Sequence, residues 1–165
     1  MPDSISVVIH RILVCPVHIY RGHHGGPPGD ETMEDRVTVT CEAGHGLVGD
    51  RYRGMEPGHK RQITFFDLAV HRELQRLFPD VGIETDLYRR NIITEGIDLN
   101  TLIGQRFRLG GVLFEGAEEC RPCYWMDEAL GLGAEEAMKG RGGLRARILE
   151  NGNLGLGPQE LVIEG

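Results

Sequence analysis

The sequence predicts a mainly β protein that folds as a small closed or nearly closed β-barrel, with one longer helix and several short helical turns. Glycine accounts for 24 of the 165 residues, about twice its average share, which favours many turns over long helices. Short β-branched and apolar runs recur along the chain, with turn residues between them. Closing such strands into a barrel removes the exposed edges that an open sandwich keeps.

One segment has the pattern of a full helix. Asp67 is a typical N-cap, apolar residues at helical spacing follow it, and Pro79 stops the helix after Phe78. The Gly-Gly pair at 110–111 and the Asn-Gly pair at 151–152 each predict a hairpin turn. Residues 21–35 predict a loop and residues 97–104 a single helical turn. The predicted strands cover residues 5–14, 36–41, 61–65, 92–94, 106–109, 112–115, 144–149 and 160–163.

Length, charge and cysteine content restrict the class of protein. A chain of this length can build one hydrophobic core, so residues 1–165 are interpreted as a single domain. The formal net charge of −7 argues against nucleic acid as a partner. His10, Arg11 and His18 interrupt the apolar N-terminal run, so neither a secretion signal nor a membrane span is expected. Because four cysteines do not indicate a disulfide scaffold in so long a chain, we expect a cytoplasmic protein with reduced thiols.

The most chemically informative stretch is residues 112–127. An apolar strand is predicted to turn at Gly116 and to lead to two thiols, Cys120 and Cys123. The run after these thiols predicts a short helix, which places Cys123 near a helix N-terminus. There the peptide dipoles and the neighbouring Arg121 favour thiolate over thiol. A thiolate is both a nucleophile and a soft metal ligand.

Other roles for the cysteines and histidines remain open. A buried structural pair of Cys120 and Cys123 would explain the two thiols equally well. A zinc site needs two further ligands, and no second pair occurs at metal-binding spacing. A thioredoxin-like dithiol has this spacing, but the surrounding βαβ pattern is missing. His23 and His24 are adjacent loop histidines, which are usually only solvated, and His71 is expected to be a core-edge residue of the predicted helix.

Arginine is the dominant basic residue, because only two of the 18 basic residues are lysines. The planar guanidinium suits bidentate capture of phosphate or carboxylate, although a codon bias would produce the same composition. In residues 88–94, strand alternation would place Arg89 and Asn91 on one face and Arg90 on the other. Arg89 with Asn91 is then a candidate site for an anion and an amide, and a salt-bridged strand end is the alternative.

Several short motifs follow one another in a recognisable order. The glycine-rich loop 44–54, which carries Asp50 and Arg51, permits close approach of the backbone to a ligand, although an ordinary tight turn would also need such glycines. The motifs lie at residues 46–51, 61–64, 89–91, 97–104, 110, 122–123 and 140–146. In this order and spacing the chain resembles the MOSC domain, the module at the C-terminus of molybdenum cofactor sulfurase. The resemblance covers about residues 5–163, and the chain looks like a free-standing bacterial-type member of the family.

The resemblance implies a largely antiparallel barrel similar to the small barrel domain of pyruvate kinase. It implies that Cys123 binds molybdenum or carries a sulfane sulfur, since the corresponding cysteine of the related amidoxime-reducing enzymes binds the metal of the pterin cofactor. Arg89 and Asn91 would help to hold the pterin and its phosphate. Weaker candidates for lining the same mouth are Asp50, Arg51 and Arg61.

We therefore expect a protein that binds the molybdenum cofactor (molybdopterin) and reduces N-hydroxylated or N-oxide substrates. The chain has no iron–sulfur or flavin domain, so a separate reductase is the expected electron donor. The alternative is a non-catalytic carrier of cofactor, or of sulfur as a cysteine persulfide, for metallosulfur cluster assembly. Since the chain has no pyridoxal-phosphate domain, a cysteine desulfurase would have to supply that sulfur. A second alternative is a thiol redox or binding module without metal.

Overall fold

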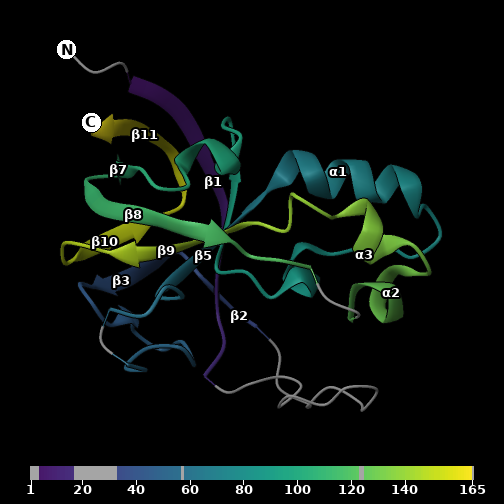
Figure 1. Ribbon diagram of the computed structural model, residues 1–165, viewed down its shortest axis with the longest axis horizontal. Coiled ribbons are helices and arrows are strands. Elements are labelled where there is room, and N and C mark those ends of the chain that lie inside the picture. Colours follow the sequence, from purple (N-terminus) through teal and green to yellow (C-terminus); the bar gives the residue numbers. More distant parts are fainter. Residues whose placement is uncertain (1–3, 17–32, 57, 123–124, 165) are drawn as a thin grey trace.

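The computed structural model describes residues 4–16, 33–56, 58–122 and 125–164, apart from the side chain of residue 125. Four residues singled out in the sequence, His18, His23, His24 and Cys123, lie outside this described part. A β-barrel and a group of helices lie side by side (Figure 1). In the described part no helix has both the length and the apolar character needed to cross a membrane.

Seven strands of the described chain close into a barrel in the order β1-β11-β7-β8-β9-β5-β6, and β1 closes the ring by pairing with both β11 and β6. The pairings around the ring are antiparallel except that of β5 with β6, which is parallel. β2 extends the sheet beyond β1, and a separate three-stranded sheet has the order β10-β3-β4. The predicted mainly β barrel is confirmed. The strands are β1 Ser4–Val14, β2 Glu34–Arg36, β3 Thr38–Glu42, β4 Gly46–Leu47, β5 Ile63–Asp67, β6 Ile92–Glu95, β7 Arg106–Leu109, β8 Val112–Glu119, β9 Leu144–Ile148, β10 Gly152–Gly155 and β11 Gly157–Glu164.

Side chains fill the interior of the barrel. Alternate residues of the first part of β8 are buried, as expected for a strand with one face on a core. Phe65 contacts Phe107 and Phe114 edge-on, with ring centroids 6.0 and 5.7 Å apart. Since the barrel interior is apolar and packed, a polar functional site must lie on its outer wall or at a rim.

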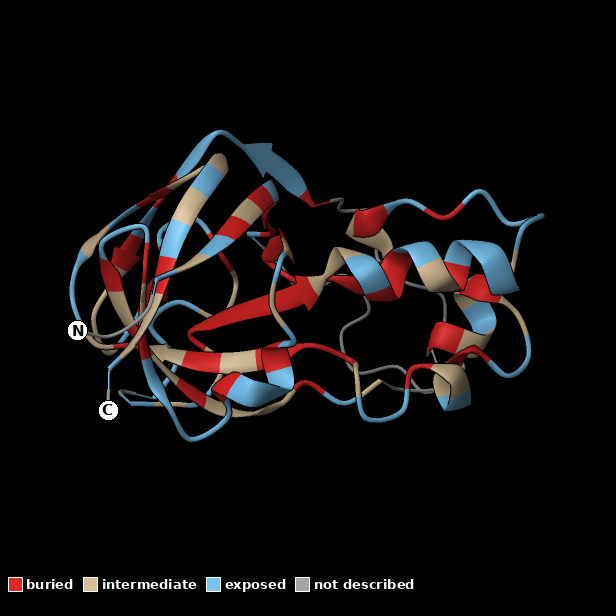
Figure 2. Cartoon of the chain, turned by 90° about the horizontal axis from the view of Figure 1, so that it is seen from above, coloured by how far each residue is buried: buried red, intermediate tan, exposed pale blue. Residues whose placement is uncertain are grey.

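Most of the helices pack on one side of the barrel (Figures 1 and 2) and share a second apolar core with residues of its wall. Leu99 and Leu102, which lie in one short 3-10 helix, belong instead to the core of the barrel. The longest helix is α1 (Leu68–Leu77), and Asp67 caps it by accepting a hydrogen bond of 2.9 Å from the N–H of Ala69, so the predicted helix is confirmed. In this second core Tyr88 stacks on Phe66 and its hydroxyl lies 2.8 Å from Nδ1 of His71, a buried core residue. The remaining helices are α2 Trp125–Leu130, α3 Ala134–Ala137 and the 3-10 helices η1 Thr85–Tyr88 and η2 Leu99–Leu102.

Two predicted turns are wrong. β8 continues through Gly116, where a Cβ atom would lie only 2.0 Å from the carbonyl oxygen of Leu102, so this glycine admits the η2 segment against the strand. The Asn151–Gly152 pair does not form a hairpin, because β10 pairs with β3 and not with β9. The predicted strand 36–41 is divided at Val37 into β2 and β3, whereas the Gly110–Gly111 turn joins β7 to β8 as expected.

Candidate functional site

The described thiol of the 112–127 stretch lies where the barrel meets the helices. Cys120 follows the last residue of β8, its side chain is 1% exposed, and its N–H donates to the carbonyl oxygen of Gly143 at 2.7 Å. At Gly142 a Cβ atom would lie 2.2 Å from the carbonyl oxygen of Cys120 and 2.8 Å from Cδ of Pro122. The glycines of the 140–146 motif therefore allow two backbone segments to pack directly against each other.

Three arginines from different segments act on the thiol of Cys120. Arg61 precedes β5, Arg90 precedes β6, and Arg145 belongs to β9. Burial raises the pKa of Cys120, but the positive charges of Arg90, Arg61 and Arg145, with a hydrogen bond from Arg145, outweigh burial and hold this pKa below its ordinary value. An environment that favours a thiolate is thus found at Cys120, where arginines create it. Cys123, for which the sequence predicts a similar effect from a helix N-terminus, lies outside the described residues.

Arg61 and Arg145 each have a buried N–H group that forms no hydrogen bond with the described residues. Their Nε atoms are buried, and neither has a hydrogen-bond partner among the described residues. Burial lowers the pKa of Arg61, while the nearby Cys120 and Tyr52 act in the opposite direction. Arg145 pairs with Glu118 through an Nη1–Oε1 distance of 3.2 Å. Buried N–H groups normally find an acceptor, so these donors mark a place where an anion would be well bound.

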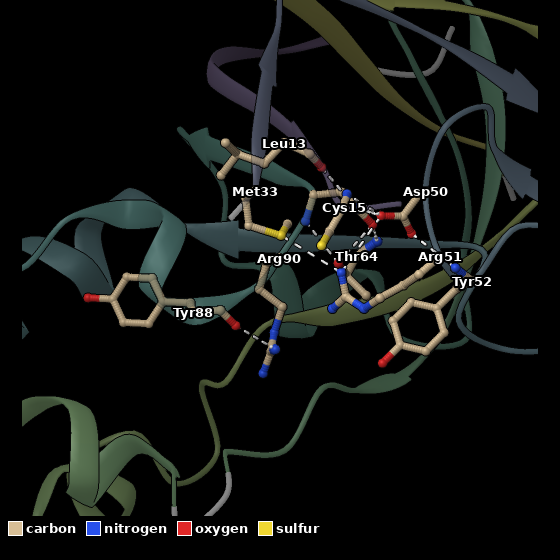
Figure 3. Close-up of polar contacts among 10 residues, drawn as sticks. Leu13, Cys15, Met33, Asp50, Arg51, Tyr52, Thr64, Tyr88 and Arg90 are labelled. Atoms are coloured by element: carbon tan, nitrogen blue, oxygen red, sulfur yellow. Dashed lines mark hydrogen bonds and ion pairs between the residues drawn. The ribbon is translucent and has the colours of Figure 1, made fainter. Parts of the chain in front are cut away.

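A buried polar network lies beside the cluster of arginines (Figure 3). The Asn91 side-chain oxygen accepts hydrogen bonds of 3.0 Å from both the N–H and the hydroxyl of Thr64. Its amide nitrogen donates to the carbonyl oxygen of Leu13 at 3.0 Å and to Asp50 at 3.3 Å. Asp50 also accepts from the N–H of Cys15 at 3.1 Å. The Asn91 amide therefore uses its hydrogen-bonding positions inside the protein and positions β1, β5 and the loop of Asp50.

Replacing Asn91 by alanine should lower the free energy of unfolding by about 3 kcal/mol, because it leaves buried donors and acceptors of Thr64 and Asp50 unsatisfied. Urea unfolding followed by circular dichroism measures this change. Asn153, which accepts an exposed hydrogen bond from Thr40, is the matched control, and Asn153→Ala should cost about 0.5 kcal/mol. Equal losses in the two variants would show that the buried network does not hold these segments.

Tyr52 connects the polar network to the arginines at Cys120. Its ring lies 4.6 Å from the guanidinium carbon of Arg51 and 4.4 Å from that of Arg61. The Nη1 of Arg51 is 3.9 Å from Oδ1 of Asp50. The structure therefore brings together Asp50, Arg51 and Arg61, three residues that the sequence identified as neighbours of one site. Figure 3 shows Asp50, Arg51 and Tyr52.

The predicted arrangement of residues 89–91 is wrong. Arg89 has a φ of 60° at the C-terminal end of η1, and β6 begins only at Ile92, so strand alternation does not apply. Arg89 is buried, with 6% of its surface exposed. Arg90, expected to point away from the site, instead lies beside Cys120. The sequence analysis did not identify Tyr52, Arg90 and Arg145 as site residues. For Arg145, the preceding glycines could have indicated the site, because they permit close backbone approach there.

The described residues show no ready-made metal cage. No group of three or more histidine, cysteine, aspartate or glutamate side chains in this part of the chain is placed to hold a metal ion. The described cysteines, Cys15, Cys41 and Cys120, are buried, and burial raises the pKa of Cys41 to about 12.

Comparisons with known proteins identify the family. The family model of the MOSC domain matches residues 21–159. The fold is similar to that of YuaD from Bacillus subtilis, with a TM-score of 0.76 and 15% identity over 100% of both chains. It is also similar to YiiM from Geobacillus stearothermophilus, with a TM-score of 0.69 and 15% identity over 96% of this chain and 75% of that one. For YiiM from Escherichia coli the TM-score is 0.61 and the identity 21%, over 94% of this chain and 71% of that one. A comparison with curated protein sequences finds no significant match. Since the family model covers most of the sequence, the chain belongs to the MOSC domain family.

Proposed function

We propose that the protein binds the molybdenum cofactor, a molybdenum ion held by a phosphorylated pterin, at the end of β8. The observation that carries this proposal is the convergence of Arg61, Arg90 and Arg145 on Cys120 in a protein with a formal net charge of −7. Cations gathered at one place in an acidic protein favour a polyanionic ligand. Membership of the MOSC family supports the choice of this particular anion.

The donors of the site fit a phosphorylated pterin. The buried Nε atoms of Arg61 and Arg145 have no partner among the described residues, and a phosphate or pterin oxygen would satisfy them. Arg89 and Arg51 would add positive charge, and Asn91 would keep the strand starts in place. Cys123, outside the described residues, is proposed as the protein ligand of the metal. When bound, the cofactor supplies a redox centre for reduction of an N-hydroxylated substrate, with electrons from a separate reductase.

A second candidate function rests on the thiol of Cys120. Guanidinium groups that favour a thiolate would also stabilise the anion of a cysteine persulfide. The protein would then carry sulfur, supplied by a cysteine desulfurase, to another acceptor. The two candidates differ in outcome: a reductase turns over substrate repeatedly, whereas a carrier transfers one sulfur or one cofactor without turnover.

The proposal is tested by metal and pterin analysis of protein purified from a host that makes the cofactor. Arg145→Ala removes a proposed phosphate donor and should lower the molybdenum and pterin content at least about tenfold. Arg147 provides the control, because it lies two residues along the same strand and pairs with Glu115 much as Arg145 pairs with Glu118. We expect Arg147→Ala to retain the cofactor. A wild-type protein free of molybdenum and pterin, or equal losses in both variants, would overturn the proposal.

The enzyme and the carrier are separated by a turnover assay. The loaded protein is mixed with an N-hydroxylated amidine and a chemically reduced dye as electron donor. Consumption of many substrate molecules per chain supports the reductase. Protein that retains the cofactor, shows no turnover and delivers cofactor or sulfur to an acceptor protein supports the carrier.

A further inference from the structure

Arg90 joins three separate segments of the chain through its guanidinium group. Its Nη1 donates to the carbonyl oxygen of Tyr88 at 2.8 Å, its Nε to that of Gly142 at 3.0 Å, and its Nη2 to that of Cys120 at 3.3 Å. The residue is 5% exposed. One buried side chain therefore links the start of β6, the end of β8 and the loop before β9.

The positive charge of Arg90 is buried beside the thiol of Cys120 and, in the part of the chain that the structure describes, not beside a carboxylate. Among the described residues no carboxylate forms an ion pair with it, and its hydrogen bonds all go to neutral carbonyl groups. Burying a guanidinium is costly unless hydrogen bonds and an opposite charge compensate for it. Among the charges that lower the pKa of the Cys120 thiol, that of Arg90 has the largest effect. Geometry and charge thus connect Arg90 to the same residue.

The surroundings of Arg90 leave its guanidinium little freedom. A Cβ atom at Gly143 would lie 3.3 Å from Arg90 Nε and 2.4 Å from the carbonyl oxygen of Phe65, so only glycine lets this backbone approach. On the other side Tyr88 is held by its stacking on Phe66, with ring centroids 4.0 Å apart, and by its contact with His71. The carbonyl groups that Arg90 binds therefore belong to well-held segments.

We propose that Arg90 is a positioning residue of this site, whose guanidinium fork ties the backbone at Cys120 to the backbone at Gly142 and so determines where the segment after β8 begins. This role deepens the proposed function in one respect, since that segment leads in sequence to Cys123, the proposed metal ligand. Lysine carries the same charge but presents it as a point, and it cannot bind the three carbonyl groups in the same planar arrangement.

Hydrogen exchange tests the tie without any cofactor. Peptides covering residues 117–122 and 141–145 should exchange about tenfold faster in Arg90→Lys and Arg90→Met than in the wild type, because the guanidinium fork is lost. Arg108 is the control, since it binds the carbonyl oxygen of Gly111, Glu150 and Glu164 near the start of β8. Arg108→Lys should leave exchange in these two peptides unchanged. Wild-type exchange in Arg90→Lys, or equally faster exchange in both lysine variants, would overturn the proposal.

A measurement on the unmodified chain keeps the test independent of how the variants fold. In native-state hydrogen exchange with increasing urea, the two peptides should lose protection together, because one side chain holds both. Loss of protection at clearly different urea concentrations would overturn the proposal.

A spectroscopic pH titration separates positioning from general destabilisation. In a Cys15→Ala, Cys123→Ser background, the ultraviolet absorbance of the thiolate reports Cys120, because the pKa of Cys41 is about 12. The charged groups that face the thiol are Arg61, Arg90 and Arg145, with Glu118 paired to Arg145. Arg90→Met should raise the midpoint by about one unit, and Arg90→Lys, which keeps the charge, should raise it less. An unchanged midpoint in Arg90→Met would overturn the link between Arg90 and Cys120.

Cofactor content then distinguishes this inference from the proposed function. We expect Arg90→Lys to retain about tenfold less molybdenum and pterin than the wild type, as when a residue supporting a metal ligand is lost. Wild-type content in Arg90→Lys, together with faster exchange, would show that the tie exists but does not serve the site, and so would overturn the positioning role. A wild type without cofactor rejects the proposed function, while the exchange and titration results still decide the role of Arg90.

Discussion

Replacing Cys123 by serine is expected to remove nearly all molybdenum from protein purified out of a cofactor-producing host. A serine hydroxyl is a harder and far less acidic ligand than a thiolate, so it binds a thiophilic metal poorly. The expectation follows from the proposed function, in which Cys123 is the protein ligand of molybdenum. Elemental analysis and pterin fluorescence of the purified variant measure the result.

Cys120→Ser is the paired variant, because Cys120 lies only three residues earlier and is itself inclined to ionise. We expect it to keep most of the molybdenum, since the arginines and the proposed metal ligand remain. It should nevertheless unfold at a lower temperature, because the guanidinium groups lose a neighbouring negative charge. A greater loss of metal from Cys120→Ser than from Cys123→Ser would transfer the role of metal ligand to Cys120.

Replacing Gly142 by alanine should strongly destabilise the protein. The new Cβ would lie 2.2 Å from the carbonyl oxygen of Cys120, well inside contact distance. One of the two backbone segments must move, and we expect unfolding to become easier by more than about 3 kcal/mol. Urea unfolding of the variant gives the value directly.

Gly155 offers the matched control for this substitution. It lies in β10, and a Cβ there would meet Thr38 and Val37 at ordinary distances of 3.8 and 3.9 Å. Gly155→Ala should change stability by about 1 kcal/mol or less. Similar losses at the two glycines would mean that the close approach of Cys120 to Gly142 is not required by the fold.

The sequence predicted those parts of the fold that depend on local interactions. The N-cap at Asp67, the helix that follows it and the Gly110–Gly111 hairpin each depend on residues close in sequence, and each is confirmed. The partner of β10 could not be predicted, because its pairing with β3 joins segments more than a hundred residues apart. Gly116 was predicted to be a turn because the close approach of η2 is not visible in the local sequence, where a glycine usually indicates a turn.

The candidate site shows the same division. Asp50, Arg51 and Arg61 were identified from their motifs, and the structure brings them together through Tyr52. Arg90 was assigned to the wrong side because a strand was assumed to begin before it. A single left-handed residue, Arg89, breaks the alternation on which that assignment depended. No periodic pattern in a sequence reveals one such residue.

The parallel pairing of β5 with β6 has a consequence for how the site is assembled along the chain. Two parallel neighbours begin at the same rim of a barrel, so the chain must travel back across the molecule between them, here through α1 and η1. Arg61 and Arg90 each stand two residues before their strand, and the return path delivers both to one rim. The pairing of β5 with β6 then determines how far apart these two cationic groups lie, and the helical crossover makes that pairing possible. The helices that cover the barrel wall are therefore also the connection that brings these two charges to the same end of the barrel.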